Sequence, residues 1–213
     1  MIKAVLFDLD GTLIDTNELI LKSFQHTFKE MLNLEPSEEE ITINYGKPLQ
    51  ETFKAYDENK IEEMIACYRK INMELHDNTC KEFSGVKFML ETLKEQGIKL
   101  AVVTSKKRDM AERGARLMGI FHYFDAFITP EVTVKHKPEG EPVLKACSEL
   151  GVKPEEALMV GDSPYDILAG KNGGAKTCGV TYTALPLSKL EESKPDFWVD
   201  KPLEILDIVN KLK

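Results

Sequence analysis

Short apolar runs alternate with amphipathic stretches along most of the chain. Runs with few polar interruptions are typical of parallel strands covered on both faces, whereas apolar residues three and four apart indicate helices with one buried face. Gly97, Gly119 and Gly151 each follow such a helical stretch, where glycine commonly ends a helix. The predicted strands are 2–7, 98–103, 126–128, 157–160, 177–180 and 197–199, and the predicted helices among them are 86–96, 108–118, 142–150, 165–172 and 203–212.

Residues 15–80 show helical spacing throughout and no convincing strand. The spacing predicts amphipathic helices over residues 17–34 and 59–75. Between them, the acidic run that begins at Ser37 predicts a capping box and a short helix, and residues 44–48 form a predicted loop. This block is therefore predicted to be a helical insert.

Strand and helix alternate elsewhere, which predicts an α/β fold with a doubly wound, Rossmann-like parallel sheet. We expect residues 1–14 together with 81–213 to form this core, and residues 15–80 to form an inserted helical bundle. In such sheets ligands bind beyond the carboxyl ends of the strands, near the point where the strand order reverses. The residues that directly follow each predicted strand are thus the candidates for chemistry.

Two aspartates, Asp8 and Asp10, follow the first predicted strand and are separated by one residue. Alternate residues of a strand project to the same side, so the two carboxylates are expected to lie close together. Two such groups repel unless a cation or a shared proton lies between them, and Mg2+ is an oxygen-seeking cation. Gly11 ends the strand and would let the backbone approach a ligand. Taken alone, these residues are equally compatible with surface acids in a turn.

The later strands end in residues that complete a site for a metal ion and a phosphate group. Thr104 and Ser105 follow the second predicted strand, and Lys137 lies in the loop after the third. Asp162 and Asp166 follow the fourth. Each has an ordinary structural explanation: Ser and Asp residues cap helices, and a loop lysine is commonly solvated. Together, carboxylates suit Mg2+, while hydroxyl, ammonium and backbone N–H groups suit phosphoryl oxygens.

The amino-acid composition limits the kinds of partner and the cellular location that we expect for the chain. The net charge is −8 and Lys and Arg form no dominant basic stripe, which argues against nucleic acid as the main partner. No apolar run approaches ~20 residues, so no membrane span is expected. The four cysteines are widely spaced and are expected to be reduced, which favours a cytoplasmic protein. The four histidines show no metal-ligand spacing and are expected at surface or boundary positions, and no obligate protein partner is evident.

Four motifs in order resemble those of the haloacid dehalogenase superfamily: residues 8–13, 103–105, 137–138 and 161–166. The helical insert lies between the first and second motifs, where that superfamily has its helical cap. The chain is most similar to the phosphoglycolate phosphatase-like subgroup and, within it, to bacterial inorganic pyrophosphatases. That closer similarity is carried by stretches within 15–27, 68–77 and 169–172. One departure is Gly140, where a second proline is common, and it is expected to loosen the loop that positions Lys137.

The resemblance implies a Mg2+-dependent phosphohydrolase with an aspartyl-phosphate intermediate. Asp8 would be the nucleophile and a metal ligand. Asp10 would be the general acid and then the general base, with its backbone carbonyl on the metal. Its presence favours phosphoryl transfer, because the dehalogenases of the superfamily lack this second acid. Gly11 would lie against the substrate.

The other motif residues receive roles from the same resemblance. Thr104 and Lys137 would be catalytic. Thr104 and the N–H of Ser105 would hold the transferring phosphoryl oxygens, and Lys137 would neutralise the phosphoryl group and Asp8. Asp162 would bind Mg2+, with Asp166 supporting it from behind.

The cap is expected to close over a small phosphorylated anion, with hinges near residues 15–17 and 84–85. Lys47 is predicted to bind the remote end of the substrate, and Arg69 and His76 are further polar candidates. Each of these is also compatible with an ordinary surface position.

Several functions remain open on the sequence alone. Inorganic pyrophosphate is the first substrate expected and 2-phosphoglycolate the second. A β-phosphoglucomutase of the same fold would instead pass the phosphoryl group to a sugar. A phospho-receiver module also combines acids, a hydroxyl and a lysine on a parallel sheet, but its paired acids are adjacent and it has no such cap.

Overall fold

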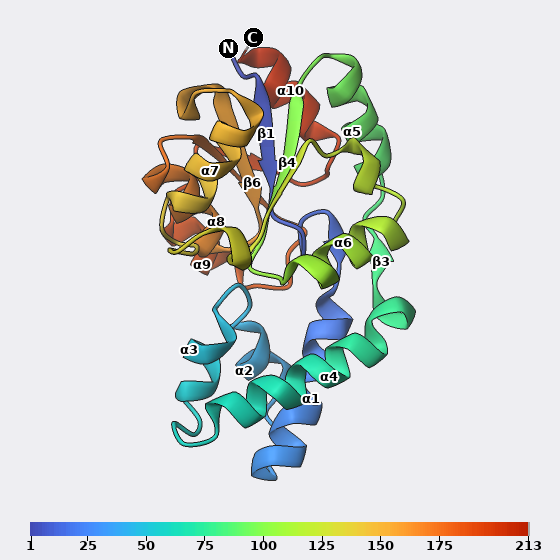
Figure 1. The fold of residues 1–213 in the computed structure, drawn as a ribbon, viewed down its shortest axis with the longest axis vertical. Coiled ribbons are helices and arrows are strands. Elements are labelled where there is room, and N and C mark those ends of the chain that lie inside the picture. The colour runs from blue at the N-terminus through green and yellow to red at the C-terminus, as the bar shows by residue number, and fades with distance from the viewer. Residues whose placement is uncertain (213) are drawn as a thin grey trace.

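The computed structural model describes residues 1–212, in which a parallel sheet with helices on both faces adjoins a group of helices (Figure 1). The strands of this sheet are β1 (Ala4–Phe7), β4 (Lys99–Val103), β5 (Ala126–Ile128), β6 (Ala157–Gly161), β7 (Lys176–Val180) and β8 (Phe197–Val199). The helices around it are α5 (Val86–Glu95), α6 (Arg108–Leu117), α7 (Glu141–Leu150), α8 (Pro164–Asn172), α9 (Leu187–Glu192) and α10 (Glu204–Lys211).

Alternating apolar side chains attach the sheet to both helical layers. In β1, Val5 and Phe7 belong to one buried cluster and Ala4 and Leu6 to the other. The strands β4 and β6 divide their residues between the same two clusters in the same way. Since both faces of these strands are buried, their sequences read as continuous apolar runs, which is the pattern that predicted them.

The strand order is β5-β4-β1-β6-β7-β8, and every neighbouring pair is parallel. The chain fills one side of β1 with β4 and β5, and then returns to fill the other side with β6, β7 and β8. The order therefore reverses at β1, whose carboxyl end points toward the separate group of helices (Figure 1). The predicted fold class, a doubly wound α/β core with an inserted helical cap, is confirmed.

The inserted helices are α1 (Asn17–Leu32), α2 (Glu38–Thr42), α3 (Leu49–Lys54) and α4 (Ile61–Thr79). Their shared core is aromatic: Phe24 and Phe28 on α1 meet Phe53 on α3 and Tyr68 on α4. Ser37 begins α2 through the predicted capping box. The short helices α3 and α9 were not predicted, because each has only six residues and too few turns to show a period.

A two-stranded antiparallel sheet joins the cap to the core and was also not predicted. Its strands, β2 (Ile14–Asp15) and β3 (Lys81–Glu82), have two residues each, so no alternation of polar and apolar residues can reveal them. They occupy the connections where the hinges were expected. Over residues 1–212, no helix has both the length and the apolar character needed to cross a membrane.

Candidate active site

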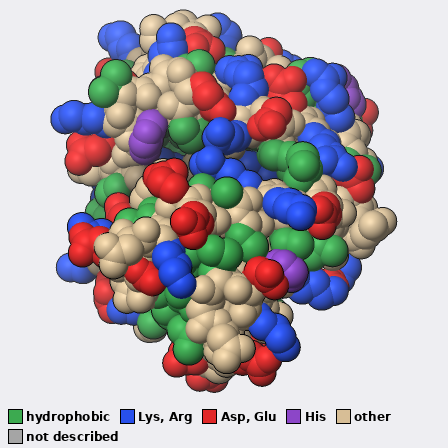
Figure 2. Space-filling model, turned by 60° about the horizontal axis from the view of Figure 1, so that its bottom comes forward, with side chains coloured by type: hydrophobic (Ala, Val, Ile, Leu, Met, Phe, Trp, Pro, Cys, Tyr) green, Lys and Arg blue, Asp and Glu red, His purple; other side chains and the backbone are tan. Residues whose placement is uncertain are grey.

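One cavity of about 400 Å³ lies between the carboxyl ends of the strands and the cap. Its lining includes every predicted site residue except Asp166: Asp8, Asp10, Gly11, Lys47, Thr104, Ser105, Lys137 and Asp162. They come from the loops that follow β1, β4, β5 and β6 and from the cap loop before α3. Figure 2 shows Lys and Arg side chains gathered at a hollow in the middle of one face.

A buried ammonium group organises the acids. Lys137 Nζ lies 2.8 Å from Asp8 Oδ1, 2.6 Å from Asp166 Oδ1 and 3.2 Å from the carbonyl oxygen of Val103. An ammonium group has three N–H donors, so these three acceptors use all of them. Lys137 is therefore fixed in place and bridges the end of β1 to the start of α8.

Asp166 is held from both sides. Its Oδ1 accepts from Lys137, and its Oδ2 accepts from the backbone N–H and the hydroxyl of Ser163, at 3.0 and 2.7 Å. Ser163 and Asp166 form a capping box at the first turn of α8. Both oxygens are thus engaged, which gives Asp166 the position of a support behind the cavity.

Gly140 lies where the predicted loosening of the Lys137 loop can be checked. A Cβ on Gly140 would lie 2.5 Å from the backbone carbonyl carbon and oxygen of Asn172. The side chain of Asn172 in turn donates to the carbonyl oxygen of Pro138 at 2.9 Å. The loop thus contacts the end of α8, and glycine at this position permits the close backbone approach.

Burial alters the ionisation of this group. Desolvation raises the pKa of Asp8 to about 7, although Lys137 acts in the opposite direction. Desolvation, with the neighbouring Asp166 and Asp8, also raises the pKa of Asp162 well above its usual value. Burial alone would lower the pKa of Lys137, but Asp166 and Asp8 hold it above its usual value. One ammonium group does not compensate all the buried acids.

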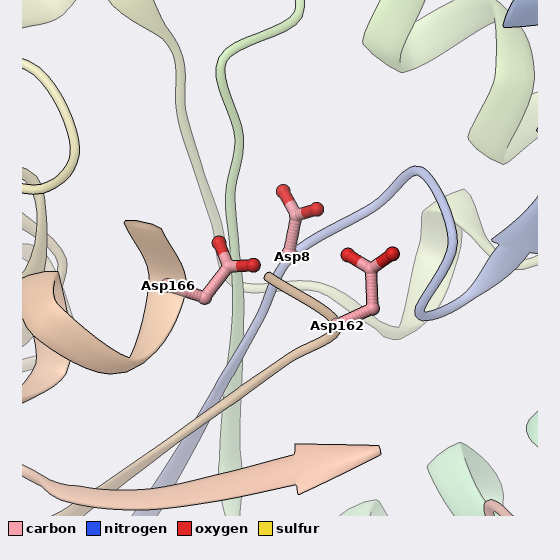
Figure 3. Close-up of side chains that lie close together, drawn as sticks. All are labelled: Asp8, Asp162 and Asp166. Carbon is pink, nitrogen blue, oxygen red and sulfur yellow. The ribbon is translucent and has the colours of Figure 1, made fainter. Parts of the chain in front are cut away.

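Asp8, Asp162 and Asp166 present carboxylate oxygens within 4.8 Å of one another, and their carboxylates point to the same side in Figure 3. Lys137 contacts one oxygen of Asp8, and Thr183 donates to one oxygen of Asp162 at 2.9 Å. Among the contacts of residues 1–212, no hydrogen-bond donor meets the second oxygen of either carboxylate. Two buried carboxylates with raised pKa values and a free oxygen each suit a divalent cation, which favours their ionised form.

Gly11 lies against this acidic group. Its φ is +78°, and a Cβ there would lie 2.3 Å from Asp162 Oδ2. The sequence prediction was a close approach of the backbone to a ligand, and the close approach that the structure shows is to the Asp162 carboxylate. Any side chain at this position would displace Asp162.

The second acid, Asp10, has a partner that was not predicted. Lys106 Nζ lies 2.7 Å from Asp10 Oδ1, and the Lys106 backbone N–H donates to Thr104 Oγ1 at 3.1 Å. Thr104 is buried, whereas Ser105 is exposed at the cavity lining. The sequence signal for Lys106 was its position directly after Thr104 and Ser105 at a strand end.

The cap residues that were candidates for substrate contact lie in different surroundings. Lys47 and Arg69 line the cavity, and the Lys47 ammonium group donates to Asn44 Oδ1 at 2.8 Å. His76 was expected at a surface or boundary position, but its side chain is 0% exposed, so that prediction is wrong. It belongs to the buried face of α4 with Tyr68 and Asn72, four residues apart, which is the helical spacing that marks a buried position.

The cap contacts the core through α4, where Arg113 on α6 donates to Asp77 at 2.8 Å, and through the loop before α3. Gly46 has a φ of +80°, and a Cβ there would lie 2.7 Å from Ser163 Cβ and 2.8 Å from its hydroxyl oxygen. Nearby, the Tyr165 hydroxyl donates to Glu51 at 3.3 Å. The structure therefore places the cap in direct contact with the loop that carries Asp162.

Comparison with known proteins identifies the class. The haloacid dehalogenase-like hydrolase family model matches residues 5–180. The chain belongs to this family, which confirms the resemblance and the prediction of a hydrolase.

Individual relatives extend over the whole chain. A Clostridium perfringens protein named "Putative pyrophosphatase PpaX" is 80% identical over 212 residues, covering 100% of this chain and 99% of its own. The "Pyrophosphatase PpaX" of Bacillus cereus strain B4264 is 44% identical, covering 99% and 98%. Among solved structures, a "predicted phosphoglycolate phosphatase" from Haemophilus somnus 129PT is 28% identical, with a TM-score of 0.83 and 97% of each chain covered.

Proposed function

We propose that this chain is a Mg2+-dependent phosphohydrolase that cleaves inorganic pyrophosphate through a phosphoryl intermediate on Asp8. The observation that carries the proposal is the Asp8 carboxylate: it is buried, lines the cavity, and is held on one oxygen by Lys137. A nucleophile must be positioned before attack, and the fixed lysine supplies that positioning.

The proposed reaction has two steps. An Asp8 oxygen forms a bond to phosphorus while the bond to the leaving oxygen breaks, and water then attacks the phosphorylated Asp8. Asp10 protonates a leaving oxygen that needs a proton, and then takes the proton of the attacking water. The Thr104 hydroxyl and the Ser105 N–H donate to the transferring phosphoryl oxygens, and Lys137 offsets their charge.

The metal site is part of the proposal. Asp8, Asp162 and the backbone carbonyl of Asp10 would hold Mg2+, and Asp166 would support them through Lys137 and Ser163. When bound, Mg2+ offsets the repulsion between the nucleophile and an anionic phosphoryl group.

We propose pyrophosphate as the first candidate substrate for two reasons. The relatives at 80% and 44% identity over nearly the whole chain bear the name pyrophosphatase. In addition, the cavity is lined by the cationic side chains of Lys47, Arg69, Lys70, Lys106 and Lys107 around the acidic group, which suits a small, highly charged anion. The second candidate, 2-phosphoglycolate, is favoured by the structural similarity to a protein named as a phosphoglycolate phosphatase.

We also propose that residues 15–80 act as a unit that opens and closes over residues 1–14 and 81–213. Support comes from the aromatic cluster of the cap helices, to which Leu185 and Ala184 of the core also contribute, and from the two-stranded connection at the base of the cap. The four free cysteines support a cytoplasmic location, because disulfides form in oxidising compartments.

The test is phosphate release from pyrophosphate and from 2-phosphoglycolate, side by side, with Mg2+ and with chelator. Asp8→Asn is the blank. We expect Mg2+-dependent release that favours pyrophosphate and is absent in the variant. A preference for 2-phosphoglycolate would select the second candidate, and release that persists in Asp8→Asn would refute the assignment of the nucleophile.

A further inference from the structure

The mechanism above gives no role to Lys106, whose ammonium group lies at the site. It lies in the loop between β4 and α6, and its backbone hydrogen bond to Thr104 fixes that loop. Its side chain is 12% exposed and lines the cavity beside Asp10. It is thus held in place and still accessible to a ligand.

The two lysines of the site differ in how many of their donors are used. Lys137 donates to three acceptors and has none left for a substrate. Over residues 1–212, Lys106 Nζ donates only to Asp10, at 2.7 Å. Two of its three N–H donors are therefore free for an anion in the cavity.

The position of Lys106 corresponds to the leaving group. In the proposed mechanism, the Asp10 carboxylate faces the leaving oxygen, and an ammonium group hydrogen-bonded to that carboxylate lies next to the same oxygen. An alkoxide leaving group must gain a proton as it departs, whereas a phosphate leaving group is stable as an anion. A fixed cation beside the leaving oxygen therefore helps a phosphate group more than an alkoxide.

We propose that Lys106 binds the departing phosphate of pyrophosphate and thereby favours phosphoanhydrides over phosphoesters, an inference that rests on the proposed function. As Asp8 bonds to one phosphorus, the bond from that phosphorus to the bridging oxygen breaks, and its electron pair stays on the bridging oxygen. The product leaves as inorganic phosphate, hydrogen-bonded to Lys106. Asp10 keeps its carboxylate for the second step, in which it accepts a proton from water.

The experiment compares Lys106→Met, Lys106→Gln and Lys106→Arg with the unmodified protein, measuring kcat/KM for pyrophosphate and for 2-phosphoglycolate with Mg2+. This ratio covers the steps up to departure of the leaving group. We expect the two neutral variants to lose about 10- to 100-fold on pyrophosphate, the size of one charge-assisted hydrogen bond, and less than about 3-fold on 2-phosphoglycolate. Arginine should restore most of the loss, and Lys145→Met, on α7 away from the cavity, is the matched control.

The outcomes separate the two proposals. A loss on 2-phosphoglycolate that equals or exceeds the loss on pyrophosphate would show that Lys106 acts by holding Asp10 in place, because Asp10 matters more for the phosphoester. Unchanged activity on pyrophosphate would show that Lys106 does not bind the leaving group. Either result overturns this inference alone. If the unmodified protein does not hydrolyse pyrophosphate, the proposed function and this inference both fail. Two neutral variants with different shapes distinguish loss of the ammonium group from a folding defect of one variant. Thermal unfolding of each variant measures such a defect directly.

Discussion

At the residue scale, the buried ion pairs of Lys137 connect stability to catalysis. Lys137 and Asp166 are each less than a tenth exposed, and Asp8 is 7% exposed. Removing one partner of a buried ion pair leaves a charge without compensation, which is more harmful than losing the attraction alone. The same lysine that positions the nucleophile is therefore expected to stabilise the fold.

Lys137→Met should lower the free energy of unfolding by about 3–5 kcal/mol at pH 8 in chelator, because two carboxylates then remain buried without a cation. Urea unfolding measures this. Lys145→Met, at an exposed position, should change stability by no more than about 0.5 kcal/mol. A loss below about 1 kcal/mol for Lys137→Met would show that the acids are solvated in the native state.

The raised pKa of Asp8 predicts that the stabilisation of the protein by Mg2+ depends on pH. Its pKa is about 7 in the folded chain against 3.8 without burial, so the folded state binds more protons between these values. The free energy of unfolding without metal should therefore fall as pH rises through this window. Mg2+ favours the ionised carboxylate, so its increase of Tm should be larger at pH 8 than at pH 5, by calorimetry. An increase independent of pH would contradict burial of Asp8 as an acid.

Asp10→Asn should affect the two substrates unequally. Loss of a general acid lowers rates by about 10²–10⁴-fold where the leaving group needs a proton, as in 2-phosphoglycolate. Phosphate leaves without one, so the loss of kcat/KM on pyrophosphate should be smaller. Equal losses on both substrates would show that Asp10 acts on them in the same way.

At the element scale, the sequence predicted the strands and helices with strong periodicity and missed the shortest ones. The buried strands β1, β4 and β6 are apolar because both faces are covered, so their sequences identify them directly. The strands β2 and β3, which join the cap to the core, have two residues each, and their pairing joins segments far apart in the chain, which no local pattern reveals.

Some residues of the candidate site could likewise be predicted from the sequence, and others could not. Residues at strand ends, such as Asp8 and Asp162, could be predicted because parallel strands bring their carboxyl ends together. The Lys106–Asp10 contact depends on how the loop before α6 packs against the loop after β1, which local sequence does not determine. The burial of His76, in contrast, was marked by its helical spacing with Tyr68 and Asn72.

The loop before α3 offers a test of cap closure. Gly46→Ala would place a Cβ 2.7 Å from Ser163 Cβ, so the cap could not close as it does here. A displacement of about 1 Å at a reacting group can lower kcat/KM by about 10²-fold, and we expect a loss of that order on pyrophosphate.

Gly97→Ala is the matched control for backbone strain. Gly97 has a φ of +75°, close to the +80° of Gly46, but a Cβ there has no atom within 4 Å. Both variants should lose roughly 1–2 kcal/mol of stability, and only Gly46→Ala should lose activity. Full activity in Gly46→Ala would show that this cap contact is dispensable for turnover.

At the scale of the whole molecule, an acidic chain concentrates cationic side chains around one cavity. The net charge is −8, yet five Lys or Arg side chains, together with Lys137, line the space between cap and sheet. A highly charged anion is attracted to this local field even though the molecule as a whole repels it. The fold creates this cavity, because the strand order reverses at β1 and the cap covers that point.

In the proposed reaction, the phosphoryl group passes through Asp8. The most direct measurement is mass spectrometry of the Asp8 peptide after rapid acid quenching during pyrophosphate turnover with Mg2+. We expect a transient gain of one phosphoryl group on Asp8 that disappears as phosphate is released, and none in chelator or in Asp8→Asn. Turnover of pyrophosphate without that modification would contradict it, and a modification that persists without phosphate release would indicate a phospho-receiver instead of a hydrolase.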